Sequence, residues 1–196
     1  MYVFLVVLAL VLLFLAVLLI RAAAFKPKAD NYYEPQGVDF NGDKAVENLC
    51  ELVRFKTVSY RDASLEDDAE FKKLIAKLPT LYPMVFKTCE YKELPDRALL
   101  FKWSGKSSSE PSVMMAHYDV VPVDESAWDK PPFEAIVEDG VIWGRGTLDT
   151  KVTVNGILSA AEKLISDGFV PENDIYFAFS GGEEVNGKGA VLIVDY

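Results

Sequence analysis

Three short apolar runs, each ending abruptly in acidic or imidazole side chains, set the strongest limit on how this chain can fold. They are Val113-Met-Met-Ala-His-Tyr-Asp119, Trp143-Gly-Arg-Gly-Thr-Leu-Asp149 and Phe179-Ser-Gly-Gly-Glu-Glu184. Short apolar runs between turn residues are typical of buried strands. Open α/β sheets place their binding and catalytic groups just past the carboxyl ends of strands. The pattern therefore predicts an α/β domain whose site gathers one histidine and four carboxylates.

The side chains at these ends suit a metal-dependent hydrolase. His117 and Asp119 are two residues apart, so an extended chain places both on one side. A metal-binding imidazole usually donates its other N–H to a carboxylate, and Asp119 is positioned to accept it. Asp149 could instead cap the helix that follows it. Glu183 and Glu184 could be a solvated pair, although the two glycines before them favour a functional turn.

Composition limits the possible partners. A chain of 196 residues has room for one ordinary domain and an appendage. Its net charge of -10 argues against nucleic acid, which would require a basic face. Cys50 and Cys89 fit no metal or redox spacing, and we expect two buried or half-buried thiols. His117 is the one histidine in the sequence.

Residues 1–21 predict a single-pass membrane anchor. Within it, Tyr2 to Ile20 contain no charged side chain, and at about 1.5 Å per residue this run nearly matches a hydrocarbon core of roughly 30 Å. A signal peptide is the competing interpretation, because small residues follow Arg21, but the run is long for one and lacks a basic segment before it. The basic residues after the run favour a catalytic domain on the cytoplasmic side, but they do not decide the side of the membrane. Residues 22–43, rich in Pro, Asn and Gly, predict a tether.

Residues 44–196 are expected to form the catalytic domain. We expect helices from Lys44, from Leu65, after Asp149 and from Gly189, and a hairpin over 135–143 with its turn at Asp139-Gly140. We expect strands over 85–91, 98–103, 111–116 and 174–180, the third of them central and buried.

The site motifs resemble those of the co-catalytic zinc hydrolases. The resemblance rests on His117-Tyr-Asp-Val-Val-Pro122, Trp143-Gly-Arg-Gly-Thr-Leu-Asp-Thr-Lys151 and Gly182-Glu-Glu-Val-Asn-Gly187. That family includes aminoacylase, acetylornithine deacetylase, succinyl-diaminopimelate desuccinylase and the carboxypeptidases G and S. The motifs are most similar to the carboxypeptidase S and N-fatty-acyl-amino-acid hydrolase branch. The resemblance covers residues 44–196.

The resemblance implies a three-layer α/β domain, with a mixed central sheet flanked by helices, that holds a pair of zinc ions. His117 would bind one zinc, Glu184 the other, and Asp149 would bridge them. Glu183 would be the general base, and Asp119 would orient His117. The chain departs from the family in carrying Thr150 where many members have Asp or Met, and little is expected from that change.

A larger departure is length. The family has another carboxylate ligand, an inserted dimerisation domain and a late histidine ligand beyond the Glu-Glu pair. This chain stops at Tyr196, so we expect it to be the N-terminal part of such an enzyme and inactive alone, the full-length form being a possible homodimer.

The expected reaction is hydrolysis of the amide bonds of N-acyl amino acids or small peptides. Zinc lowers the pKa of a bound water and polarises the carbonyl, which amide hydrolysis requires. The alternatives are a non-catalytic membrane-anchored fragment and a domain that binds a single zinc. Which substrate is used is not encoded in these residues.

Overall fold

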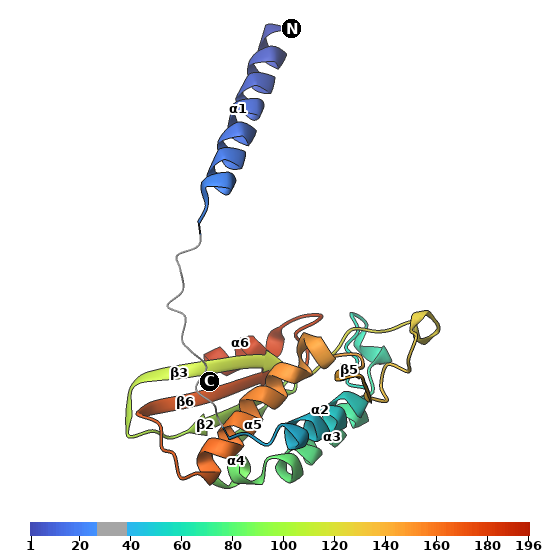
Figure 1. The fold of residues 1–196 in the computed structure, drawn as a ribbon, viewed down its shortest axis with the longest axis vertical. Coiled ribbons are helices and arrows are strands. Elements are labelled where there is room, and N and C mark those ends of the chain that lie inside the picture. The colour runs from blue at the N-terminus through green and yellow to red at the C-terminus, as the bar shows by residue number, and fades with distance from the viewer. Residues whose placement is uncertain (27–38) are drawn as a thin grey trace. The chain divides into compact units, whose positions relative to one another are not determined.

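The computed structural model describes residues 1–26 and 39–196, in two compact units, Met1–Asp39 and Phe40–Tyr196 (Figure 1). The first unit contains helix α1 (Tyr2–Ala24), which has no buried residue. Among the described residues, α1 is the one helix long and apolar enough to cross a membrane, and a signal sequence would meet the same criterion. Residues 27–38 of the expected tether lie outside the described residues.

The second unit is built on a mixed four-stranded sheet. Its strands, in spatial order, are β1 (Glu90–Leu94), β2 (Ala98–Trp103), β6 (Asn173–Ser180) and β3 (Ser107–His117). The β1–β2 and β2–β6 pairs are antiparallel, whereas β3 and β6 are parallel. In that parallel pair His117 lies opposite Ser180. The two strands therefore end at the same edge of the sheet.

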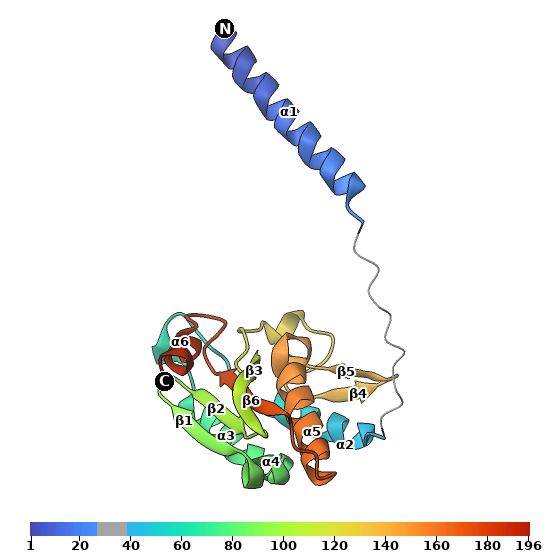
Figure 2. The same ribbon diagram turned by 90° about the vertical axis from the view of Figure 1, so that its left-hand side faces the viewer.

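Helices cover both faces of this sheet (Figure 2). They are α2 (Gly42–Arg54), α3 (Asp68–Leu81), α4 (Pro83–Thr88), α5 (Val152–Ser166) and α6 (Lys188–Asp195). Phe101, Phe177 and Phe179 point from β2 and β6 into the main core, where they join side chains of α3, α4 and α5. Residues of α6 lie over the alternate sheet positions, including Leu100 and Tyr176. This arrangement confirms the predicted mixed sheet between helical layers.

Several predicted elements are present with small changes at their ends. The second predicted helix begins at Asp68, after a short 3-10 turn over Ala63–Leu65. The predicted hairpin consists of β4 (Ile136–Glu138) and β5 (Val141–Trp143). Its turn residues Asp139 and Gly140 both have positive φ, 51° and 77°, as a two-residue hairpin turn requires.

One prediction was wrong because of a tertiary contact. Residues 85–88, expected to begin a strand, belong to α4, and only residues 90–94 form the strand. Pro83 occupies the first turn of α4, where its missing N–H costs nothing. The carboxylate of Glu162 on α5 accepts hydrogen bonds from the backbone N–H groups of Met84 and Val85, each at 2.9 Å. A side chain 77 residues away thus caps the helix, and no local pattern reveals it.

A second prediction was wrong about burial. The strand over 111–116 was expected to be central and buried, but β3 pairs only with β6 among the described residues and forms an edge of the sheet. Val113, Met114 and Met115 are 58%, 43% and 59% exposed. The apolar run is therefore a strand with its outer edge uncovered in this part of the chain.

Candidate metal centre

The site begins where β3 and β6 end together. The backbone N–H of Tyr118 donates to the carbonyl of Ser180 at 3.0 Å, which extends the pairing by one residue. Gly181 follows, and a Cβ at that position would lie 2.7 Å from the Tyr118 hydroxyl. A glycine is therefore needed for the chain to turn here. The turn brings Glu183 and Glu184 to the end of the strand that carries His117.

Three predicted metal ligands lie together at this edge. One ligand atom from each of His117, Asp149 and Glu184 lies within 4.8 Å of the others. His117 Nε2 is 3.0 Å from Asp149 Oδ1 and 3.7 Å from Glu183 Oε2. His117 is buried, whereas the side chain of Asp149 is 75% exposed, so the cluster opens to solvent on the Asp149 side. One imidazole and carboxylate oxygens are donors that suit zinc and other divalent first-row metals.

Asp119 lies behind this cluster and is fully buried. Its carboxylate accepts hydrogen bonds from the backbone N–H groups of Glu183, at 3.1 Å, and Glu184, at 3.2 Å. His117 Nδ1 lies 3.1 Å from the Asp119 carbonyl and 3.4 Å from its carboxylate. Asp119 therefore faces the ring nitrogen that points away from the ligand cluster, and the Nε2 atom is left for the cluster.

The pKa values in the cluster depend on burial and on these contacts. Burial alone would lower the pKa of His117, but the hydrogen bond and charge of Asp119, together with Glu183, raise it to about 9. Burial acts to raise the pKa of Asp119, and hydrogen bonds from His117 and from the backbone of Glu183 and Glu184 outweigh it, so that pKa is lowered. Burial raises the pKa of Glu184. The carboxylates around His117 therefore favour positive charge at this site.

Asp149 is held by a turn that differs from an ordinary helix start. Residues Thr147–Lys151 form one wide turn in which Asp149 has φ -119° and ψ 95°. The first residue of α5 has no side-chain cap, and Asp149 directs its Oδ1 atom toward His117. The interpretation of Asp149 as a helix cap is therefore wrong. Gly146 begins the turn with φ +83°, and a Cβ there would lie 2.4 Å from Val120 Cγ1.

Three supporting residues were not predicted from the sequence. Thr57 Oγ1 donates to the carbonyl of Tyr118 at 2.6 Å, and Ser59 lies buried in the same segment. Lys151 is fully buried and donates to two backbone carbonyls. Burial lowers the pKa of Lys151 to about 7, against the attraction of Asp119 and Glu70. The one sequence signal that could have pointed to Lys151 is its position two residues after Asp149.

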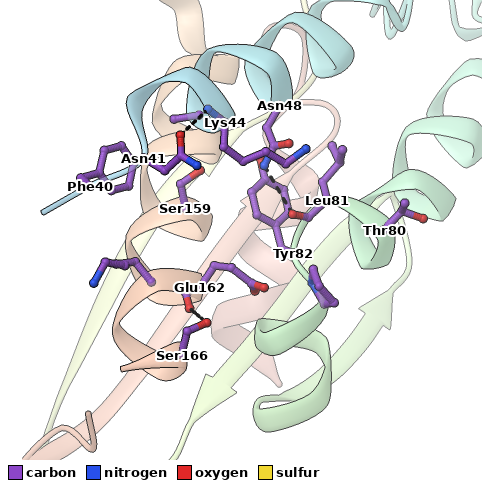
Figure 3. A pocket seen from close by; sticks show the side chains of 13 residues that line it. Phe40, Asn41, Lys44, Asn48, Thr80, Leu81, Tyr82, Ser159, Glu162 and Ser166 are labelled. Carbon is purple, nitrogen blue, oxygen red and sulfur yellow. Dashed lines mark hydrogen bonds between the residues drawn. The ribbon is translucent and has the colours of Figure 1, made fainter. Parts of the chain in front are cut away.

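A separate pocket of about 330 Å³ lies between α2, the start of α4 and α5 (Figure 3). Its walls include Tyr82 and residues 159–166 of α5. Asn48, whose amide donates to the carbonyl of Leu81, also lines it. Asp149 precedes α5, whereas these residues lie in its second half, about 10–20 Å further along at 1.5 Å per residue. The pocket is therefore not part of the ligand cluster.

A comparison with family models identifies the protein family to which the part of the chain around this cluster belongs. Residues 113–196 match the model of peptidase family M20/M25/M40. This part of the chain belongs to that family. The match contains all five predicted site residues and confirms the resemblance inferred from the motifs.

Curated relatives extend the similarity over almost the whole chain. A probable carboxypeptidase S-like protein 2 of Dictyostelium discoideum is 32% identical over 193 residues, 94% of this chain and 37% of its own length. The human N-fatty-acyl-amino acid synthase/hydrolase PM20D1 is 32% identical over 197 residues, 95% of this chain and 39% of its own. The chain thus spans less than two fifths of the length of these relatives.

Solved structures show the same fold. Human carnosine dipeptidase 1 superposes with a TM-score of 0.66 at 20% identity, covering 78% of this chain and 35% of that protein. The M20 metallo-carboxypeptidase Sso-CP2 of Sulfolobus solfataricus superposes with a TM-score of 0.56 at 21% identity, covering 70% and 30%. These likenesses confirm the predicted mixed α/β fold.

Proposed function

We propose that this chain carries the metal site of a zinc-dependent hydrolase that cleaves the amide bonds of N-acyl amino acids or small peptides. The observation that carries the proposal is the convergence of His117, Asp149 and Glu184, whose ligand atoms lie within 4.8 Å of one another. The M20 family match and the names of the relatives support it.

The ligand roles follow from chemistry and from the family resemblance. His117 and Glu184 would each bind one of two zinc ions, and Asp149, the most exposed of the three, would bridge them. Zinc held there would lower the pKa of a water molecule from 15.7 to about 7 and polarise the carbonyl of the substrate. Zinc suits this donor set, and other divalent metals of similar preference are alternatives.

The proton chemistry would belong to Glu183. Its carboxylate lies 3.7 Å from His117 Nε2, at the edge of the ligand cluster, and its side chain is 56% exposed. From there it would take a proton from the attacking water and pass it to the leaving nitrogen of the amide. Asp119 would keep the Nδ1 proton of His117 in place, so that Nε2 stays free for metal. Asp119 and Glu183 are therefore the proposed catalytic pair.

The proposed ligand set is not complete within these residues. Two zinc ions that share one bridging carboxylate need about five ligands, since a catalytic zinc usually has three from the protein. The cluster supplies three, and the sequence contains a single histidine. A second imidazole would have to come from residues outside this sequence. The 196-residue chain alone is therefore proposed to bind zinc weakly and to lack turnover.

The substrate class is taken from the relatives. The name of one relative specifies N-fatty-acyl amino acids, and that of another a carboxypeptidase, so the substrates share an amide next to a free carboxylate. The proposed homodimer is assigned to a chain of the relatives' full length. Sedimentation of a chain of the relatives' length would test it.

Elemental analysis tests the function most directly. A chain of the relatives' length that begins with these 196 residues should contain two zinc ions and release amino acid from an N-acyl substrate. One zinc without turnover would favour a single-zinc domain. No zinc would favour a non-catalytic anchored fragment, and either result would overturn the proposed hydrolase.

The proposed location is a membrane, reached through residues 1–21 as a single-pass anchor, with residues 22–43 as the tether and 44–196 as the catalytic domain. The length and exposure of α1 support this. Carbonate extraction should leave the chain with the membrane. A soluble product whose N-terminus lies near Ala24 would instead identify a cleaved signal sequence. Protease protection of closed vesicles would decide the side.

A further inference from the structure

The buried side-chain amine of Lys151 lies between three segments that surround the metal centre. It donates one hydrogen bond to the carbonyl of Leu52, at 2.9 Å, and one to the carbonyl of Phe55, at 2.7 Å. Leu52 lies in the last turn of α2 and Phe55 directly follows the helix, so both carbonyls lie at the negative end of its dipole. Each also accepts one backbone N–H, that of Phe55 and that of Thr57 respectively. Lys151 therefore caps the C-terminal end of α2, a helix that contributes none of the proposed metal ligands.

The same residue closes the turn that carries Asp149. Its backbone N–H donates to the carbonyl of Gly146 at 2.9 Å. A Cβ on Gly146 would lie 3.4 Å from Cδ of Lys151, so the lysine stem packs against the glycine that begins the turn. The position of Asp149 between these two residues thus depends on where the lysine is held.

The third segment follows directly from the end of α2. Beyond Phe55, Thr57 Oγ1 donates to the carbonyl of Tyr118, and the backbone N–H of Val120 donates to Thr57 at 2.9 Å. The N–H of Ser59 donates to the carbonyl of Val120 at 3.0 Å. Residues 57–59 therefore run beside the segment that contains Asp119, and Lys151 fixes where they start.

Burying a lysine is costly, because its head group must either lose its hydration while charged or give up its proton. Well-packed apolar residues of similar size are often as stable or more so. A methionine would fill much of the same space without a charge. The presence of a lysine here therefore points to a role beyond filling the core.

We propose that Lys151 is a positioning residue for the metal centre, which holds the Asp149 turn and the Asp119 segment at the distance that lets Asp149 meet His117. It would touch neither substrate nor metal, because its Nζ atom is bound to the carbonyls of Leu52 and Phe55. The proposal rests on the proposed function in naming zinc, although the geometry it concerns exists without metal.

The single histidine provides a direct probe. Selective ¹⁵N labelling of histidine gives the imidazole signals of His117 alone. We would compare the 196-residue chain in detergent micelles with Lys151→Met and with Lys163→Met. Lys163 is a partly exposed lysine on α5 that pairs with Asp167, so the control makes the same chemical change on the helix that follows Lys151.

In the metal-free protein, Lys151→Met should shift the His117 signals, because Asp149 would move from Nε2, and Lys163→Met should leave them unchanged. Zinc added to Lys151→Met should reach half-saturation at about 10–100-fold higher concentration than in the parent, the usual effect of losing an outer support. Circular dichroism would confirm that each variant is folded. A purely structural role would lower the melting temperature and leave both His117 readouts at parent values.

A folded Lys151→Met with parent-like metal-free signals and zinc affinity would overturn the proposal. Should that variant fail to fold, Lys151→Gln, which keeps N–H donors on a shorter neutral stem, is expected to fold and to show the same two changes. Parent-like values in Lys151→Gln would then overturn it. If zinc leaves the His117 signals of the parent unchanged, the proposed function fails at this site, and the metal-free comparison alone decides the role of Lys151.

Discussion

Asp119 Oδ2 accepts a hydrogen bond from the backbone N–H of Glu184 at 3.2 Å, across 65 residues of sequence. The other oxygen of the same carboxylate accepts from Glu183. One buried side chain therefore fixes the turn that carries both glutamates. The same residue faces Nδ1 of His117, so it joins the ends of β3 and β6.

Replacing Asp119 with Asn should loosen this junction. The amide keeps one oxygen but turns an N–H₂ group toward a backbone N–H, which costs about 1–3 kcal/mol of stability for the unsatisfied donor. The pKa of His117 should fall from about 9, because the charge of Asp119 helps to raise it. At pH 9 and above, where the imidazole proton no longer competes with metal, zinc affinity should fall about 10–100-fold. Titration of the His117 signals with acid and with zinc measures both, and unchanged values would show that Asp119 does not act on the imidazole.

Replacing Glu183 with Gln should separate metal binding from turnover. In a chain of the relatives' length, the variant should keep its zinc and lose about 10²–10⁴-fold in turnover, the usual contribution of a general base. Glu172→Gln is a matched control, because Glu172 is a 78%-exposed glutamate directly before β6, at the end of the strand away from the metal centre. Loss of zinc from Glu183→Gln would mean that the roles of Glu183 and Glu184 are reversed.

Zinc binding should depend on pH through His117. Its pKa in the folded chain is raised from 6.5 to about 9, so a proton must leave before Nε2 can bind metal. The apparent affinity of the 196-residue chain for zinc should rise up to about tenfold per pH unit between about pH 7 and pH 9, and then level off. In the metal-free chain the same shift stabilises the fold below pH 6.5, and that contribution is lost as the pH rises through about 9. Zinc titrations at several pH values test this, and a profile that His117→Ala leaves unchanged would exclude the imidazole as the source.

The uncovered strand β3 should make the second unit associate with itself. Val113 and Met115 expose apolar side chains on a strand whose outer edge is free within the described residues, and such edges recruit other strands. Met115→Lys should reduce association of the unit from Phe40 to Tyr196 in sedimentation measurements. Val137→Lys is the control, since Val137 is 54% exposed on the separate two-stranded sheet. Equal effects of the two variants would show that net charge, and not the β3 edge, governs solubility.

Local pattern accounted for much of the fold. The apolar stripe after Asp149 and the glycine at 168 predicted α5, and the Asp139-Gly140 pair predicted the hairpin, because both signals act within a few residues. Residues 85–88 failed for the opposite reason, since their helix is capped by Glu162 from another helix.

For the candidate site, the sequence alone determined which residue types stand at the strand ends, because the apolar runs and the glycine turns are local. The tertiary structure decided that His117, Asp149 and Glu184 meet, through the parallel pairing of β3 with β6, and that Asp149 does not cap a helix. It also revealed that Lys151 is fully buried, which its neighbours in sequence do not indicate. Its partners, Leu52 and Phe55, lie nearly 100 residues earlier in the chain, and a contact over that distance depends on how the helices pack against the sheet.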